Sequence, residues 1–235
     1  FLMEQKKDVN LAGLPKSLVS TSQLDAERLI EEELECTRCH GLNGQGNNTS
    51  TDLTDAGARL NKEWLKNYLV APRLFDGDDT AMPSFFYQVD ASTKNYKPVT
   101  PDASARIDAV VAYFMALTAD EAGEGEKQFS ATRHRYPEIT AETGRNIFQS
   151  QNCQVCHTLD GLEPWFERNG PDLSIESQRV RREWLASYMS EPHAVRPFGY
   201  FAGSGSRMPN YRLTDNEAEA LTEHFVKKRR SGSTT

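Results

Sequence analysis

The sequence predicts an all-α protein made of two consecutive copies of one domain, and three observations lead to this fold class. The motif CTRCH at 36–40 returns as CQVCH at 153–157. Farther along each copy, NKEWLKNYLVAP at 61–72 corresponds to RREWLASYMSEP at 181–192. No convincing run alternates apolar and polar residues with the period of two that is typical of strands, so few strands are expected. Two long copies of this kind indicate a duplicated domain rather than a solenoid.

Each copy is expected to contain three main helices at matching places. The first leads directly into the cysteine pair, the second is the repeated tryptophan-containing segment, and the third closes the copy. In the second helix of the first copy, apolar residues at i, i+1, i+4 and i+5 from Trp64 form a stripe, and Pro72 ends the helix. The expected first and third helices are 24–34 and 102–117 in the first copy and 140–152 and 214–230 in the second, with N-caps at Asp102, Thr140 and Thr214.

The alignment of the two copies divides the chain into five parts. The segment between the copies is rich in Gly, Glu and Ala and has almost no apolar periodicity, so we interpret it as a linker. The expected parts are an N-terminal extension at 1–21, a first domain at 22–118, the linker at 119–138, a second domain at 139–230 and a C-terminal tail at 231–235.

Composition narrows the class of protein further. The 34 acidic and 27 basic residues give a net charge of -7, which argues against a nucleic-acid-binding protein. No stretch approaches the roughly 20 apolar residues of a membrane-spanning helix. Charged residues follow Phe1-Leu2-Met3 at once, so this opening is not a signal-peptide core; it is either the start of a mature chain or the remnant of a removed anchor. The 37% share of hydrophobic residues is low for two independent cores, so something besides side chains is expected to fill them.

The cysteine spacing points to a covalently bound cofactor. Two thiols three positions apart lie on one side of a helical turn, where each can add to one vinyl group of a haem. A C-x-x-C-H motif indicates c-type haem attachment, with His40 and His157 as the proximal iron ligands. A zinc site would not need both histidines, a redox-active dithiol lacks its βαβ context, and a disulfide is sterically poor at this spacing. Two haem c groups are therefore expected on Cys36, Cys39, Cys153 and Cys156.

A second iron ligand is expected well downstream of each proximal histidine, and methionine is the best candidate. Met82 and Met208 both precede a proline and occupy equivalent places in the two copies. A thioether favours ferrous iron and raises the reduction potential, and the proline stiffens the loop that holds the sulfur. Met115 and Met189 fall at positions of the helical apolar stripes and are interpreted as core residues.

The remaining histidines are weaker candidates for iron ligation. His134 falls in the linker. His193 lies in a loop that precedes Met208, which makes it the rival ligand for the second haem. His224 neighbours Phe225, which is expected to face the core, so the histidine is expected to point outward.

At this point the chain resembles the class I c-type cytochromes, arranged as two cytochrome c-like haem domains in tandem. The resemblance covers about 22–118 and 138–230 and rests on both C-x-x-C-H motifs and the repeated W-L-x-x-Y helices. It also rests on GPDL at 170–173, AMPSF at 81–85 and RMPNY at 207–211.

The resemblance implies roles for several further residues. In this family the carbonyl of a loop proline accepts the ring N–H of the proximal histidine, which implies that Pro171 holds His157. The first copy departs from the family pattern, because Thr51 stands where that proline is expected. The family also has a tryptophan near the haem propionates, and Trp64 and Trp184 resemble it; the alternative is that both are ordinary core aromatics.

The resemblance also implies a function. It implies an electron carrier rather than an enzyme, which relays single electrons between redox proteins as a shuttle or a subunit of a membrane respiratory complex. Family members receive their haem outside the cytoplasm, which implies the periplasm or the outer face of the cytoplasmic membrane. The alternatives are a dihaem enzyme of peroxidase type, in which one haem can open, and a structural subunit in which one haem is a spacer.

The first copy carries an aromatic insertion that the second copy lacks. It follows Met82, spans about 86–99, and includes Tyr87 and Tyr96. Two interpretations are open. The insertion either covers the neighbouring haem domain or forms a docking patch for a larger partner, because exposed aromatic residues are typical of interfaces.

Overall fold

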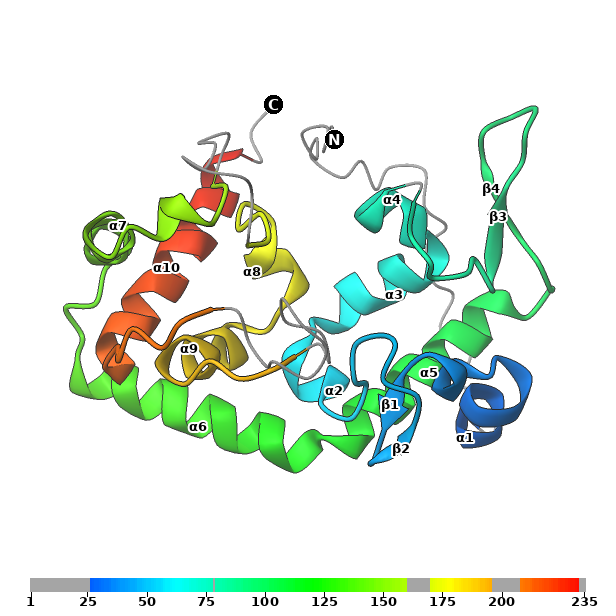
Figure 1. Cartoon of the computed structure of the whole chain (residues 1–235), viewed down its shortest axis with the longest axis horizontal. Helices are drawn as coiled ribbons and strands as arrows, with labels where there is room; N and C mark the ends of the chain where they lie inside the picture. The colour runs from blue at the N-terminus through cyan, green and yellow to red at the C-terminus, as the bar shows by residue number, and fades with distance from the viewer. Residues whose placement is uncertain (1–25, 78, 160–169, 196–207, 233–235) are drawn as a thin grey trace.

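The computed structural model describes residues 26–77, 79–159, 170–195 and 208–232, and these are mostly helical, which confirms the all-α prediction. The first half contains α1 (Ala26–Arg28), the π-helix η1 (Leu29–Glu33), the 3-10 turn η2 (Cys36–Arg38), α2 (Ala56–Arg59), α3 (Lys62–Val70), α4 (Pro72–Asp76) and α5 (Ala103–Leu117). The second half contains α7 (Ala141–Ser150), the 3-10 turn η3 (Cys153–Val155), α8 (Glu176–Arg179), α9 (Arg182–Ser190) and α10 (Asp215–Gly232). The helix α6 (Ala119–Arg135) connects the halves (Figure 1).

Two of the three expected N-caps make capping contacts. The Thr140 hydroxyl accepts the backbone N–H of Thr143 at 3.1 Å, which satisfies a free donor in the first turn of α7. At the start of α10, the backbone N–H and the hydroxyl of Thr214 donate to the Glu217 carboxylate at 2.9 and 2.7 Å. Asp102 precedes α5 as expected, but its side chain makes no capping hydrogen bond there.

The second half is built on a close crossing of α7 and α10. A Cβ atom on Gly144 would lie 1.9 Å from the carbonyl oxygen of Ala220 and 2.9 Å from the Cβ of His224, so only glycine permits this approach. The same closeness explains why His224 is buried, with 5% exposure, rather than outward-facing as its sequence position suggested. Its ring lies 6.2 Å from that of Phe148 on α7.

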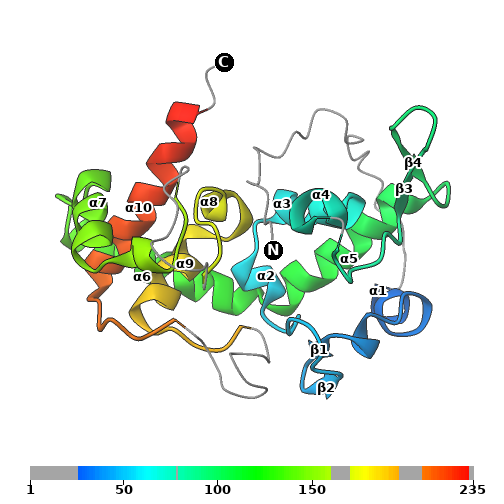
Figure 2. The same ribbon diagram turned by 45° about the horizontal axis from the view of Figure 1, so that its top comes forward.

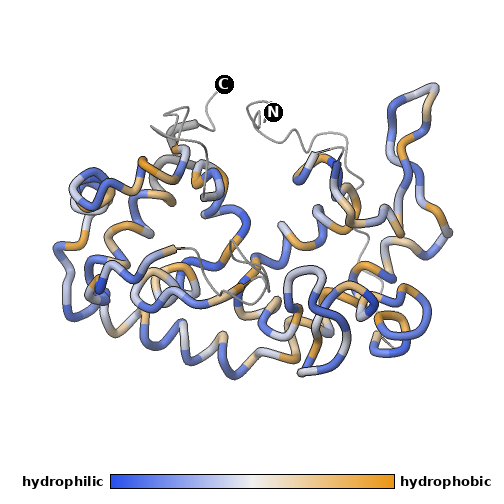
Figure 3. Tube along the Cα trace, in the orientation of Figure 1, coloured by the Kyte–Doolittle hydropathy of each residue, from blue (hydrophilic) through white to orange (hydrophobic). Residues whose placement is uncertain are grey.

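The segment expected as a linker is the continuous helix α6, which runs along the lower edge of the second half in Figure 1 and reaches α2 of the first half. Figure 3 shows it as mostly hydrophilic, unlike α5 before it. Acidic residues in its first turn and basic residues in its last turn suit the helix dipole. Only Ala122 and Thr132 are buried, so its packing face is too narrow to produce an apolar period in the sequence.

Contacts with α9 and α10 hold α6 in place. The guanidinium of Arg181 donates to Glu126 on α6 at 2.6 Å. That of Arg182 lies 4.7 Å from the centre of the Phe129 ring and also pairs with Glu223 on α10. The linker is therefore a packed helix, and the packing of the second half includes residues of this helix as well as its own.

Strands are few, as expected. Two short antiparallel hairpins occur in the described part of the first half: β1 (Gly41–Leu42) with β2 (Gln45–Gly46), and β3 (Tyr87–Val89) with β4 (Tyr96–Pro98). The aromatic insertion forms the second hairpin, which Figures 1 and 2 show on the side of the first half remote from the second. The interpretation that it covers the neighbouring domain is therefore wrong.

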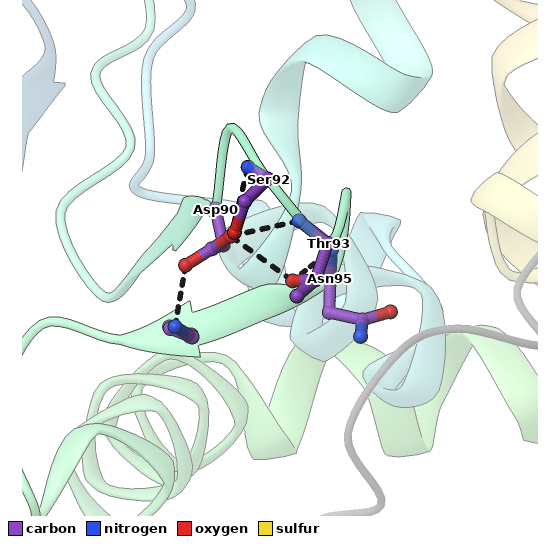
Figure 4. Close-up of polar contacts among 5 residues, drawn as sticks. Asp90, Ser92, Thr93 and Asn95 are labelled. Carbon is purple, nitrogen blue, oxygen red and sulfur yellow. Dashed lines mark hydrogen bonds and ion pairs between the residues drawn. The ribbon is translucent and has the colours of Figure 1, made fainter.

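The aromatic side chains at the base of this hairpin are core residues rather than an exposed docking patch. Phe86 and Tyr87 are only 3% and 6% exposed and belong to the hydrophobic core. At the tip, the Asp90 carboxylate accepts the backbone N–H groups of Ser92 and Thr93 at 2.9 and 2.8 Å and pairs with Lys97 (Figure 4). The ion pair with Lys97 and these hydrogen bonds hold the pKa of Asp90 well below its usual range.

Candidate haem sites

The two C-x-x-C-H motifs fold into the same turn. Each begins after a residue with left-handed backbone, which redirects the chain into a 3-10 turn: Glu35 at φ 50° before η2 and Asn152 at φ 55° before η3. The N–H of each histidine donates to the carbonyl of the first cysteine, at 3.0 Å from His40 to Cys36 and at 3.0 Å from His157 to Cys153. The turn therefore places two thiols and an imidazole on one short stretch of chain.

The first cysteine of each pair is largely withdrawn from water. Burial raises the pKa of Cys36 and of Cys153 to about 11. Both side chains pack against the hydrophobic core, and no disulfide joins any of the four cysteines. The first sulfur atom of each site therefore lies beside an apolar surface, against which an apolar macrocycle could pack.

A backbone carbonyl orients each histidine that is expected to bind iron. The Nδ1 of His157 lies 2.8 Å from the carbonyl oxygen of Pro171, and the Nδ1 of His40 lies 2.6 Å from that of Thr51. Donation from Nδ1 leaves Nε2 with its lone pair, the form that binds iron. Burial lowers the pKa of His157, which favours this neutral ring. The threonine in the first copy thus makes the same contact as the proline in the second.

Equivalent backbone hydrogen bonds fix both carbonyl-bearing loops. In the second copy, the N–H of Gly170 donates to Cys156 O at 3.0 Å. In the first, the N–H of Ser50 donates to Cys39 O at 2.8 Å. A side chain at position 170 would clash with the histidine, because a Cβ atom added to Gly170 would lie 2.5 Å from Cε1 of His157. The position of the carbonyl therefore depends on the backbone path of the loop, which is why a different side chain at Thr51 is tolerated.

The methionines expected as axial ligands lie at the edge of the core. Met82 and Met208 are half-buried and pack against the hydrophobic cluster that Cys36 and Cys153 also contact. The backbone N–H of Met82 donates to the Thr80 hydroxyl at 3.3 Å, which helps to shape its loop. Each methionine thus borders the same hydrophobic cluster as the first cysteine of its copy, where its thioether would be available as an iron ligand.

A stacked tryptophan and tyrosine recur in both copies. The Trp64 and Tyr68 rings are 5.0 Å apart and inclined by 19°, and those of Trp184 and Tyr188 are 4.9 Å apart and inclined by 17°. Both tryptophans are partly buried against the core. The two tyrosines were outside the predicted site residues, although the i,i+4 spacing in the repeated helix was a signal for them.

A third ring distinguishes the two copies. Phe75 packs edge-on against Trp64 at 5.4 Å in the first copy. In the second, His193 lies edge-on to Tyr188 at 5.4 Å and to Trp184 at 6.2 Å. The imidazole of His193 is exposed, and its Nδ1 lies 3.3 Å from the Glu191 carbonyl. The rival ligand is thus engaged with the aromatic pair.

Comparison with known proteins identifies the class of protein. The chain belongs to the cytochrome c family, because the cytochrome c sequence model matches it twice, at residues 26–118 and 141–228. It is a dihaem c-type cytochrome with two cytochrome c domains in tandem, which confirms the predicted fold and the implied family. Neither the curated proteins nor the solved structures that were compared give a match to the chain. Within the described ranges, every helix is too short or too polar to cross a membrane.

Proposed function

We propose that the protein relays single electrons through two haem c groups and binds no substrate at iron. In the first domain, Cys36 and Cys39 would carry the haem, with His40 and Met82 as iron ligands. The observation that supports this assignment is that a backbone carbonyl orients the imidazole of His40, with its oxygen 2.6 Å from Nδ1. Such orientation is typical of histidines that bind metals.

The second domain repeats the proposal with its own residues. Cys153 and Cys156 would carry the haem, with His157 and Met208 as iron ligands and the Pro171 carbonyl as the orienting group at 2.8 Å. Bound iron would supply one-electron chemistry between its ferric and ferrous forms. The chain's own contribution would be to hold both axial ligands in either state. Trp64 and Trp184 are both proposed to lie near the haem propionates of their domains.

The partners and location follow from the family and stay proposals. We propose that redox proteins of a membrane respiratory complex donate and accept the electrons, and that this protein is a subunit of such a complex or a shuttle that serves it. Since the family attaches haem outside the cytoplasm, we propose the periplasm or the outer face of the cytoplasmic membrane as the site of action. The proposed ligation of both irons by a histidine and a methionine favours this role over that of a peroxidase-like enzyme, which needs an iron that can open.

Binding of small ligands separates the electron carrier from the enzyme. The dithionite-reduced protein is exposed to carbon monoxide, and the ferric protein to hydrogen peroxide, while absorption is recorded. An electron carrier with four protein ligands on its two irons is expected to show neither a carbon monoxide complex nor peroxide turnover. A carbon monoxide complex at one haem would contradict the proposal and favour the openable-haem alternative.

A further inference from the structure

The two domains meet in a short antiparallel pairing of their backbones. Leu60 and Val180 face each other as an isolated bridge. The N–H of Asn61 donates to the carbonyl of Arg179 at 2.9 Å, and the N–H of Arg181 donates to the carbonyl of Arg59 at 2.8 Å. Two backbone hydrogen bonds thus join segments that are far apart in the chain.

The pairing brings equivalent positions of the duplicated domain together. Leu60 and Val180 immediately precede the repeated segments NKEWL and RREWL, so each is the counterpart of the other. The two backbone hydrogen bonds also correspond to each other, so a local two-fold axis relates the two segments. A contact of this isologous kind is self-complementary, which is how two copies of one surface commonly pair.

The pairing is packed rather than exposed. Leu60, Val180 and Arg59 are 9%, 2% and 8% exposed, and the two apolar residues belong to one hydrophobic cluster with residues of both domains. Water has little access to the hydrogen bonds between the two segments, so their loss would leave buried polar groups without partners.

Asn61 adds bonds that its counterpart does not make. Its side-chain N–H group donates to the carbonyls of Gln178 and Val180, each at 2.8 Å, and these lie at the C-terminal end of α8. A single amide of the first domain therefore closes a helix end of the second. The counterpart Arg181 instead bonds within its own side of the contact, to Glu126 and Glu183 at 2.6 Å each.

The pairing is also directly continuous with the helices that carry the candidate haem tryptophans. The helices α3 and α9 begin directly after it, and each carries its site's tryptophan in the first turn: Trp64 is three residues after Asn61, and Trp184 is three residues after Arg181. The orientation of one tryptophan-bearing helix relative to the other is thus set at the bridge.

We infer that Asn61 is a positioning residue for electron transfer between the two haem groups. It holds the two domains in one arrangement, so an electron that enters at one haem passes to the other within the same molecule. The inference rests on the proposed function, since it requires both domains to carry haem.

The backbone conformation offers a selective variant, Asn61→Pro. Asn61 has φ -68° and Leu60 before it is extended, at φ -95° and ψ 145°, and both suit a proline at position 61. The substitution removes the N–H and the side-chain amide together, while the carbonyl that accepts the Leu65 N–H in α3 remains. Lys62→Pro is the matched control, because it places proline at the first position of the same helix, where it is well tolerated.

Three measurements on the dihaem protein test the inference. Pulsed electron paramagnetic resonance gives the distribution of iron–iron distances, hydrogen exchange reports the N–H of Arg181, and flash photolysis gives the interhaem transfer rate. In Asn61→Pro we expect a broadened distance distribution, faster exchange, and a rate lower by about tenfold, because reaction between held groups depends steeply on their placement. The two reduction potentials are expected to stay unchanged, and Lys62→Pro is expected to match the wild type in every measurement.

The outcomes separate the inference from the proposed function. A wild-type distance distribution and rate in Asn61→Pro would overturn the inference alone. If Asn61→Pro does not incorporate two haems, Asn61→Ala, which keeps the backbone N–H, is measured in its place. Smaller changes of the same kind are expected in Asn61→Ala, and wild-type values in this variant would overturn the inference. A wild-type protein that binds fewer than two haems would instead overturn the proposed function.

Discussion

Thr51 and Pro171 stand at the same place in the two domains, although one carries a hydroxyl and the other a ring. Both use only the backbone carbonyl to accept from a histidine, at 2.6 and 2.8 Å. The loop path, fixed by hydrogen bonds to the C-x-x-C-H turn, therefore matters more than the side chain. The proposed chemistry of each site depends on the two side chains that would ligate iron, the imidazole and the thioether.

Replacement of the axial methionine tests that assignment directly. Met82→His is expected to keep the first haem low-spin but to lower its reduction potential by on the order of 0.1 V or more, because axial ligands tune haem potentials over roughly 0.8 V and imidazole stabilises ferric iron better than a thioether does. Met208→His is expected to act in the same way on the second haem. Met115→Leu serves as the core-methionine control and is expected to leave the methionine–iron charge-transfer band intact. An unchanged band in Met82→His would rule out Met82 as a ligand.

Glycine at the α7–α10 crossing is expected to be indispensable for stability. In Gly144→Ala the new methyl group would meet Ala220 O at 1.9 Å, so the helices must separate, at a cost of about 1–3 kcal/mol. Gly123→Ala in α6 is the matched control, because a Cβ there meets nothing within 4 Å. This control is expected to stabilise the protein by about 0.5–1 kcal/mol. Urea unfolding measures both, and equal effects of the two substitutions would contradict the packing explanation.

Among the helices, the contact between α6 and α10 includes polar side chains, such as Arg133 and Glu223. Glu219 on α10 is 2% exposed and its Oε2 atom has no hydrogen-bond partner among the described residues. Thr132 and Arg133 of α6 and Arg182 of α9 lie near enough to favour its charged form, and Glu223 disfavours it. Burial outweighs them and raises the pKa of Glu219 to about 7.

This raised pKa has a consequence for stability that can be measured. Below the unfolded-state pKa, near 4.5, the carboxyl is protonated in both states, and its contribution to stability is fully present. As the pH rises toward 7, the unfolded state loses its proton first, so folding becomes less favourable. We expect Glu219→Gln to remove this part of the pH dependence, so that its urea midpoint exceeds that of the wild type increasingly between pH 4.5 and 7.

The control for this experiment is Glu142→Gln, which removes the same charge from an exposed position on α7. Its midpoint is expected to vary with pH in parallel with that of the wild type, lowered by a constant amount because Glu142 lies in the first turn of the helix. If the wild-type and Glu219→Gln curves run parallel from pH 4.5 to 7, the carboxyl titrates alike in the folded and unfolded states, and the burial argument fails.

At the scale of the whole molecule, the duplication was readable in the sequence because the C-x-x-C-H motifs and the W-L-x-x-Y helices are local patterns. The arrangement of the copies was not, because it depends on non-local contacts. Leu60 and Val180 are ordinary apolar residues whose pairing no spacing reveals. The burial of His224 depends in the same way on the absent side chain of Gly144, across two helices.

The segment between the copies shows that a helix can form where the sequence has no apolar periodicity. Its Ala, Glu and Lys residues have high helix propensity, so they favour a helix even where no apolar face is present. Tertiary contacts, such as that of Arg181 with Glu126, stabilise it further. Because α6 covers parts of α9 and α10, residues 139–235 alone would lack that cover. The two domains are thus similar in sequence, but each packs against residues outside its own copy.

One measurement tests the central claim, that each domain holds a six-coordinate haem between a histidine and a methionine. It is a redox titration of the whole protein followed by absorption and near-infrared magnetic circular dichroism. We expect two covalently bound haems, two one-electron steps, and a methionine–iron charge-transfer signal that accounts for both ferric haems. A single haem, a high-spin component, or a bis-histidine signal at either haem would contradict the claim.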